Sequence, residues 1–129
     1  MNLLLDTATF LWLCAGGKEL STATIGALRQ AEGTASVSAV TAWEIGLKNA
    51  KGKLELPIPP NAWFSAMIEH HRLLVWPVEA STAIASTRLP PIHLDPFDRL
   101  LIALAQERSL ILVTPDATIS KYPDLKTLW

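Results

Sequence analysis

A chain of 129 residues, half of them hydrophobic, has room for one folded domain with a sizeable core, so we expect a single domain over residues 1–129. Its formal net charge of −1 excludes a strong overall field that would attract DNA or RNA, so any nucleic-acid contact must rely on local basic residues or on a partner. Cys14 is the only cysteine, which excludes an internal disulfide and a multi-cysteine zinc site and fits a reducing cytoplasm.

Short apolar runs alternate with helical patterns along the whole chain. Taken in order, they predict a strand over 3–5, helices over 9–15 and 22–31, a strand over 35–38, helices over 41–50 and 62–71, a strand over 73–76, helices over 80–87 and 97–108, a strand over 110–113, a short helix after Asp116 and an edge strand over 125–129. The runs 3–5, 73–76 and 110–113 are continuously apolar, which is typical of strands buried on both faces. The alternation predicts an α/β fold with a parallel sheet between two layers of helices.

Four acidic residues stand where predicted strands end or predicted helices begin. They are Asp6 after the first strand, Glu44 in the first turn of the helix after the second strand, Asp98 at the start of the long apolar helix, and Asp116 after "LVTP". The carboxyl ends of parallel strands and the adjoining helix starts form the edge of a sheet where ligands bind. We therefore expect four of the twelve acidic residues at this one edge.

Each of these acids also has a local explanation. An acid at a helix start interacts with the helix dipole by only ~0.3–1 kcal/mol. Glu44 stands three residues after Thr41, which is a capping-box spacing, and Lys48 follows four residues later as an ion-pair partner. Asp95 is a good N-cap for the helix that carries Asp98. Capping does not explain why all four acids lie at one edge, where they would repel one another unless a cation bound between them.

The ligand types indicate which cation this would be. Carboxylates with no cysteine and no histidine pair beside them favour Mg²⁺ or Mn²⁺. His70 and His71 are adjacent and diverge on a helix, and His93 lies in a proline-rich loop, so we expect none of the three to bind the metal. A hard ion that keeps open water positions most often serves phosphate chemistry.

Four segments of this chain carry its candidate acids: "LLLDT" from Leu3, "SAVTAWEIGLKNAKGKL" from Ser38, "HLDPFDRLLIALA" from His93 and "LVTPD" from Leu112. These segments resemble the PIN-domain family, and specifically the VapC-type toxins of toxin–antitoxin pairs. Together they cover essentially the whole chain in the family's order. The resemblance implies a three-layer α/β/α fold with a central parallel sheet of about five strands, and a Mg²⁺- or Mn²⁺-dependent endoribonuclease that hydrolyses phosphodiester bonds in RNA.

The resemblance also assigns roles to single residues. It makes Asp6, Glu44, Asp98 and Asp116 the catalytic, metal-binding set, with the hydroxyl of Thr114 helping to orient it. Two positions depart from the family's pattern or compete within it. Pro115 stands where the family usually has a polar residue, and this affects how far the Asp116 side chain extends toward the metal. Asp95 is a second acid in the segment "HLDPFDRLLIALA", beside Asp98. We assign the metal role to Asp98 and treat Asp95 as its cap.

Basic residues near the acids are candidates for contacting the substrate, and the resemblance indicates protein partners. Arg99 and Lys48 are the basic residues best placed to contact phosphate, whereas Lys51 and Lys53 have the pattern of solvated helix-end lysines. The resemblance implies a homodimer in the cytoplasm and a cognate antitoxin whose tail blocks the acidic edge. The apolar stripe in residues 62–71 suits core packing better than a partner helix, and no run is long enough to span a membrane.

Two rival functions would require acids that this chain lacks. A phospho-receiver domain needs paired acids after the first strand and an aspartate after the third, and a dehalogenase-like phosphatase needs a second aspartate where Ala8 stands. The alternative that survives is a non-catalytic RNA- or protein-binding module with the same PIN fold.

Overall fold

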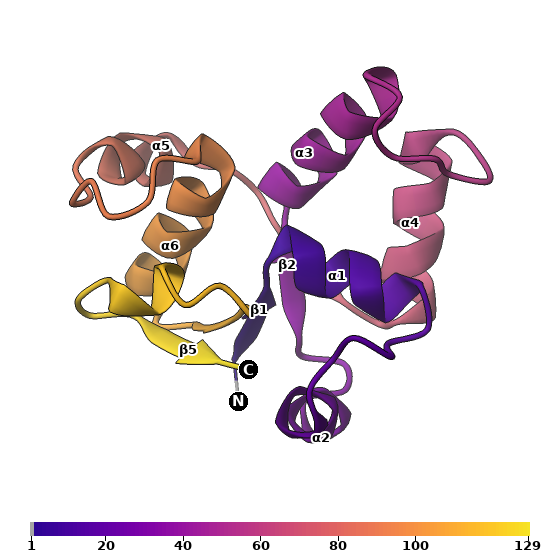
Figure 1. Cartoon of the computed structure of the whole chain (residues 1–129), viewed down its shortest axis with the longest axis horizontal. Helices are drawn as coiled ribbons and strands as arrows, with labels where there is room; N and C mark the ends of the chain where they lie inside the picture. Colours follow the sequence, from indigo (N-terminus) through magenta and orange to yellow (C-terminus); the bar gives the residue numbers. More distant parts are fainter. Residues whose placement is uncertain (1) are drawn as a thin grey trace.

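The computed structural model describes residues 2–129; Met1, the first residue of the predicted domain, lies outside them. The elements in chain order are β1 Leu3–Leu5, α1 Thr7–Cys14, α2 Thr22–Gln30, β2 Ser36–Ser38, α3 Ala39–Ala50, α4 Pro60–His70, β3 Leu74–Trp76, α5 Ala80–Thr87, α6 Pro96–Arg108, β4 Ile111–Val113, the 3₁₀ helix η1 Ile119–Lys121 and β5 Lys126–Leu128. The strands form one sheet in the order β3-β2-β1-β4-β5, and every neighbouring pair is parallel (Figure 1). The predicted α/β/α class with a five-stranded parallel sheet is confirmed.

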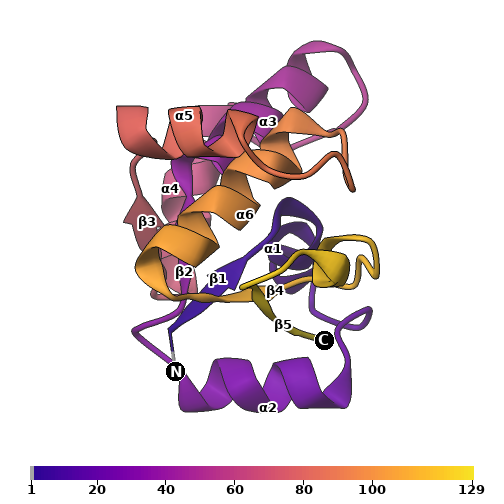
Figure 2. The ribbon, with the colours of Figure 1, turned by 90° about the vertical axis from the view of Figure 1, so that its left-hand side faces the viewer.

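Strand β1 shows how the two helical layers share the sheet. Its three leucines alternate between the faces, as side chains of a strand do. Leu3 and Leu5 pack with residues of α1, α2 and α4, whereas Leu4 packs with α6 and the segment around η1. Figure 2 looks onto the α5–α6 side, with the strands behind α6. The resulting two apolar clusters hold the carboxyl ends of β1 and β4 side by side.

Helix α3 begins two residues earlier than predicted. The side chain of Ser38, not Thr41, caps it by accepting a hydrogen bond of 3.0 Å from the Val40 N–H. Glu44 therefore lies in the second turn of the helix, and the predicted capping box at Thr41 is wrong. The local reason is that β2 passes into α3 with no intervening loop, so the helix starts as soon as the strand ends.

Strand β3 differs from the prediction of burial on both faces. Leu74 is 53% exposed, and Val75 is exposed as well. The strand is the last one on its side of the sheet and pairs only with β2. An apolar run identifies a strand, but burial on both faces also requires neighbours on both sides.

The apolar stripe of α4 packs on the core, as predicted. Trp63 is buried and its ring meets that of Phe10 edge-on with centroids 5.9 Å apart. Phe64, Met67 and Ile68 pack against the same cluster. Among the described helices, residues 2–129, there is none whose length and apolar character would let it cross a membrane.

Candidate active site

A cleft of about 410 Å³ opens at the carboxyl ends of β1 and β4, where α1, α3 and α6 begin. Figure 1 shows how these helices are arranged around the strands. The lining of the cleft includes all four of the predicted acids, together with a lysine and a tryptophan: Asp6, Glu44, Asp98, Asp116, Lys48 and Trp12. The prediction that the four acids converge at one edge is confirmed. Their chemical roles stay predictions.

Asp6 occupies the N-cap of α1. Its Oδ1 accepts a hydrogen bond of 2.8 Å from the Thr9 N–H, and its own N–H donates to the Val113 carbonyl at 3.1 Å, which ties β1 to β4. Burial raises the pKa of Asp6, and the charge of Glu44 adds to that rise, while hydrogen bonds from Thr114 and Thr9 oppose it. The carboxylate is therefore held in a place where water solvates it poorly.

Glu44 projects from the second turn of α3 into the same cleft. Its Oε2 pairs with Lys48 Nζ at 3.1 Å, which confirms the predicted pair one helical turn apart. The residue is only 9% exposed, and its Oε1 is buried without a hydrogen-bond partner among residues 2–129. An unpaired buried carboxylate oxygen is costly, and a bound cation would remove that cost. The donor set thus fits a hard divalent ion.

Asp95 and Asp98 divide the start of α6 between them. Asp95 is the N-cap, because its Oδ1 accepts from the N–H groups of Phe97 at 2.8 Å and Asp98 at 3.2 Å. Asp98 lines the cleft, as predicted. The pKa of Asp98 is raised to about 7, chiefly by burial and also by the charges of Asp95, Asp6 and Glu44, while His93 opposes the rise.

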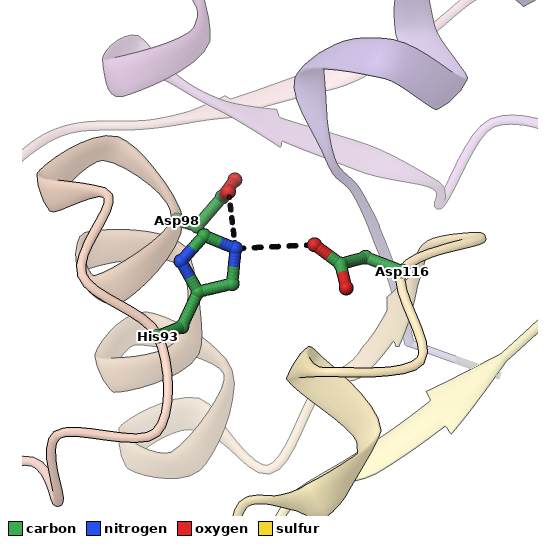
Figure 3. A group of neighbouring side chains, drawn as sticks. All are labelled: His93, Asp98 and Asp116. Atoms are coloured by element: carbon green, nitrogen blue, oxygen red, sulfur yellow. Dashed lines mark hydrogen bonds and ion pairs between the residues drawn. The ribbon is translucent and has the colours of Figure 1, made fainter.

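His93 lies in the cluster although the sequence did not indicate it. Its Nε2 is 3.2 Å from Asp98 Oδ2 and 3.1 Å from Asp116 Oδ2 (Figure 3). One potential ligand atom from each of these three residues lies within 4.8 Å of the others, so they form a possible metal-binding group. The sequence feature that could have predicted this place is the position of His93, two residues before the N-cap of the helix that carries Asp98.

Asp116 reaches the cluster despite Pro115. Its N–H donates to the Thr114 hydroxyl at 3.1 Å, and its Oδ1 accepts from the Thr118 N–H at 2.8 Å, so the turn itself aims the carboxylate. Partial burial acts to raise the pKa of Asp116. The Thr118 N–H and His93 outweigh that effect and hold the pKa below its usual value.

Arg99 has a different place from the one predicted. Its guanidinium donates to backbone carbonyls of Ser86 and Leu89 through Nη2 and of Pro90 and His93 through Nη1, at 2.9–3.1 Å. These bonds pin the loop before α6, and Arg99 does not line the cleft. The prediction that Arg99 contacts phosphate is not supported, because its amino groups are already engaged. Lys48 does line the cleft.

Comparison with known proteins agrees with this arrangement. The PIN domain family matches residues 3–125 of the chain. The chain is 32% identical over 131 residues to Ribonuclease VapC22 of Mycobacterium tuberculosis, a match that covers 99% of this chain and 98% of the relative.

Solved structures show the same fold at low identity. VapBC2 from Rickettsia felis, bound to a DNA fragment from its promoter, matches with a TM-score of 0.74 at 14% identity, over 100% of this chain and 99% of the other. DNA-bound VapBC from Salmonella typhimurium matches with a TM-score of 0.71 at 17% identity, over 99% and 97%.

Proposed function

The chain belongs to the PIN domain family, and on that premise we propose that it is a metal-dependent endoribonuclease, the toxin of a toxin–antitoxin pair. The observation that carries the proposal is the convergence of four acids in one cleft, one of them with a buried oxygen that lacks a partner among residues 2–129. The near full-length likeness to Ribonuclease VapC22 supports RNA as the substrate.

Asp6, Glu44, Asp98 and Asp116 are the residues that would hold the metal, and Mg²⁺ or Mn²⁺ is the ion that such carboxylates favour. When bound, the ion supplies Lewis-acid stabilisation of the phosphate and makes hydroxide available near neutral pH. Without it, the same carboxylates repel an RNA phosphate. Their burial strengthens their attraction for a cation, because little water screens it.

Lys48 supplies the positive charge that faces the substrate. Its ammonium pairs with Glu44 through one of three N–H groups, and its side chain is 44% exposed. The remaining donors are free to contact a phosphate oxygen at the mouth of the cleft. Thr114 is buried between the two acids in the hydrogen-bond network: its side chain bonds the Asp6 carboxylate, and its hydroxyl accepts from the backbone N–H of Asp116 at 3.1 Å, so it positions both residues.

A cognate antitoxin and a second copy of this chain are the proposed protein partners. The matched VapBC structures are toxin–antitoxin complexes, which supports the first partner. Exposed apolar side chains on β3 and α5, among them Leu74, Val75 and Ile84, support the second. We place the pair in the cytoplasm, where RNA is accessible.

The test is cleavage of RNA by the purified chain without antitoxin, in Mn²⁺, in Mg²⁺ and in EDTA. Asp6→Asn should lower the metal-dependent rate by at least about a hundredfold, because several kcal/mol of charge stabilisation depend on the ligands. Asp124→Asn is the matched control, since Asp124 is exposed, lies outside the cleft lining and has a positive φ that asparagine tolerates. RNA binding without metal-dependent cleavage would identify the non-catalytic binding module instead.

A further inference from the structure

The tautomer of His93 is determined by the backbone of Asp95. The Asp95 N–H donates a hydrogen bond of 3.1 Å to His93 Nδ1. A backbone N–H can only donate, so Nδ1 must present its lone pair. The proton of the neutral imidazole is then on Nε2.

Nε2 is directed at two carboxylates, which accept hydrogen bonds when they are ionised. It lies 3.2 Å from Asp98 Oδ2 and 3.1 Å from Asp116 Oδ2, and Figure 3 shows this one corner of the ring facing both side chains. The two acids come from different elements, α6 and the turn after β4. A single N–H shared by both oxygens therefore fixes the distance between side chains that would otherwise repel each other.

A separate set of hydrogen bonds holds the backbone of His93. Its N–H donates to the Tyr122 hydroxyl at 2.7 Å, and its carbonyl accepts from Arg99 Nη1 at 3.1 Å. Arg99 also binds the carbonyls of Ser86 in the last turn of α5 and of Leu89 and Pro90 in the same loop as His93. The ring is thus anchored from α6 and from the segment after η1, although it lies in a loop.

We propose that His93 is a positioning residue, whose Nε2–H holds the carboxylates of Asp98 and Asp116 in the arrangement that binds the divalent ion, while the ring itself is not a ligand. This inference rests on the metal site of the proposed function. Coordination through Nε2 would require the proton to move to Nδ1, where it would face the Asp95 N–H, donor against donor. Glu44 Oε1, buried and unpartnered among residues 2–129, independently indicates a cation in the same cleft.

The experiment measures metal affinity of the purified full-length chain. Mn²⁺ binding is followed by electron paramagnetic resonance, and Mg²⁺ binding by its competition with Mn²⁺. His93→Leu should weaken both ions by a similar factor of roughly 10–100, the usual effect of losing a hydrogen bond to a ligand. His93→Gln, whose amide N–H reaches the position of Nε2–H, should stay within about threefold of wild type. His70→Leu, at a histidine outside the cleft lining, should bind like wild type.

Metal preference separates positioning from coordination. If His93 were a ligand, losing its nitrogen would weaken Mn²⁺ selectively, because imidazole contributes little to Mg²⁺ binding. A selective Mn²⁺ loss, or wild-type affinity in His93→Leu, would overturn the inference. If His93→Leu does not fold, His93→Gln and His93→Asn make the same test. The asparagine amide reaches only the position of Nδ1, so the His93→Asn variant should bind both ions weakly, whereas His93→Gln should bind them like wild type.

The proposed function fails in a distinguishable way. A wild-type chain that binds neither ion, or an Asp98→Asn variant with wild-type affinity, would remove the metal site and this inference with it. Metal binding that depends on Asp98 but not on His93 would leave the proposed function standing and overturn only the role of His93.

Discussion

The acidic cleft has a more buried part, formed by Asp6, Glu44 and Asp98, and a more exposed part, formed by Asp116 and Lys48. The Asp98 side chain is 22% exposed, against 36% for Asp116. Burial raises the pKa of Asp98 to about 7, whereas hydrogen bonds hold the pKa of Asp116 below its usual value. The pKa values of two aspartates that share one histidine are thus shifted in opposite directions.

The comparison shows that burial, more than proximity of like charges, sets the electrostatic cost of this site. Desolvation is the largest cause of the raised pKa at both Asp6 and Asp98, and the neighbouring carboxylates add to it. The exposed part has hydrogen-bond donors for its charge, from Thr118 and His93. The buried part therefore has most to gain from a cation.

Asp98→Asn tests the buried part and has the largest expected effect on stability. A carboxyl whose folded pKa is raised stabilises the fold below its unfolded pKa of about 4, and this contribution is lost as pH rises through about 7. In EDTA, wild type should lose up to about 1.4 kcal/mol per pH unit across that window through Asp98, and the variant should lose less, because only the raised pKa of Asp6 remains. The variant should therefore melt higher than wild type at pH 7, since the lost helix-dipole interaction is only ~0.3–1 kcal/mol.

Asp116→Asn is the matched control in the exposed part, with the opposite sign. Its lowered pKa contributes stability above the unfolded pKa that is lost only as pH falls through the folded one. At neutral pH without metal, this variant should melt slightly lower than wild type. Thermal melts with EDTA and with millimolar Mg²⁺ make both comparisons, and Mg²⁺ should stabilise wild type more than either variant. A lower apo melting temperature for Asp98→Asn would contradict the buried-charge argument.

Much of this site was predictable because topology places it. The alternation of segments predicted all five strands, three of them as continuous apolar runs, and a parallel sheet brings the acids that follow strands to one edge. Asp95 was correctly separated from Asp98, because a cap and a cleft residue differ in their place in the first turn. These inferences needed only short-range pattern and one general rule of sheet geometry.

The parts that sequence could not predict depend on contacts between distant residues. His93 is placed by Tyr122, 29 residues away, and by the loop bonds of Arg99. The same bonds engage the guanidinium of Arg99, whose predicted contact with phosphate stays a prediction, since a basic residue beside a motif does not reveal which carbonyls it meets. The exposure of β3 depends on its position at the sheet edge, which its own three residues do not encode.

Lys48→Met tests whether the more exposed part of the cleft binds the substrate. A charged hydrogen bond to phosphate contributes about 1.5–3 kcal/mol, so the variant should raise KM for RNA by about tenfold or more with a smaller change in kcat. Lys51→Met is the matched control, because Lys51 caps the same helix, is exposed and does not line the cleft. An equal rise in KM for both variants would indicate a general charge effect and no specific contact.

Asp95→Asn has the smallest expected effect and separates a cap from a site residue. Asparagine caps as well as aspartate, so stability should change by no more than a few tenths of a kcal/mol. The backbone N–H that fixes His93 is also unchanged, so the rate at the pH optimum should stay within about twofold.

The charge of Asp95 is nevertheless the second cause, after burial, of the raised pKa of Asp98. Its removal lowers that pKa, because a neighbouring negative charge disfavours ionisation. The acidic limb of the pH–rate profile should therefore move to lower pH. A fall in rate as deep as that of Asp98→Asn would mean that Asp95 itself binds the metal, and an unmoved acidic limb would mean that Asp98 does not set it.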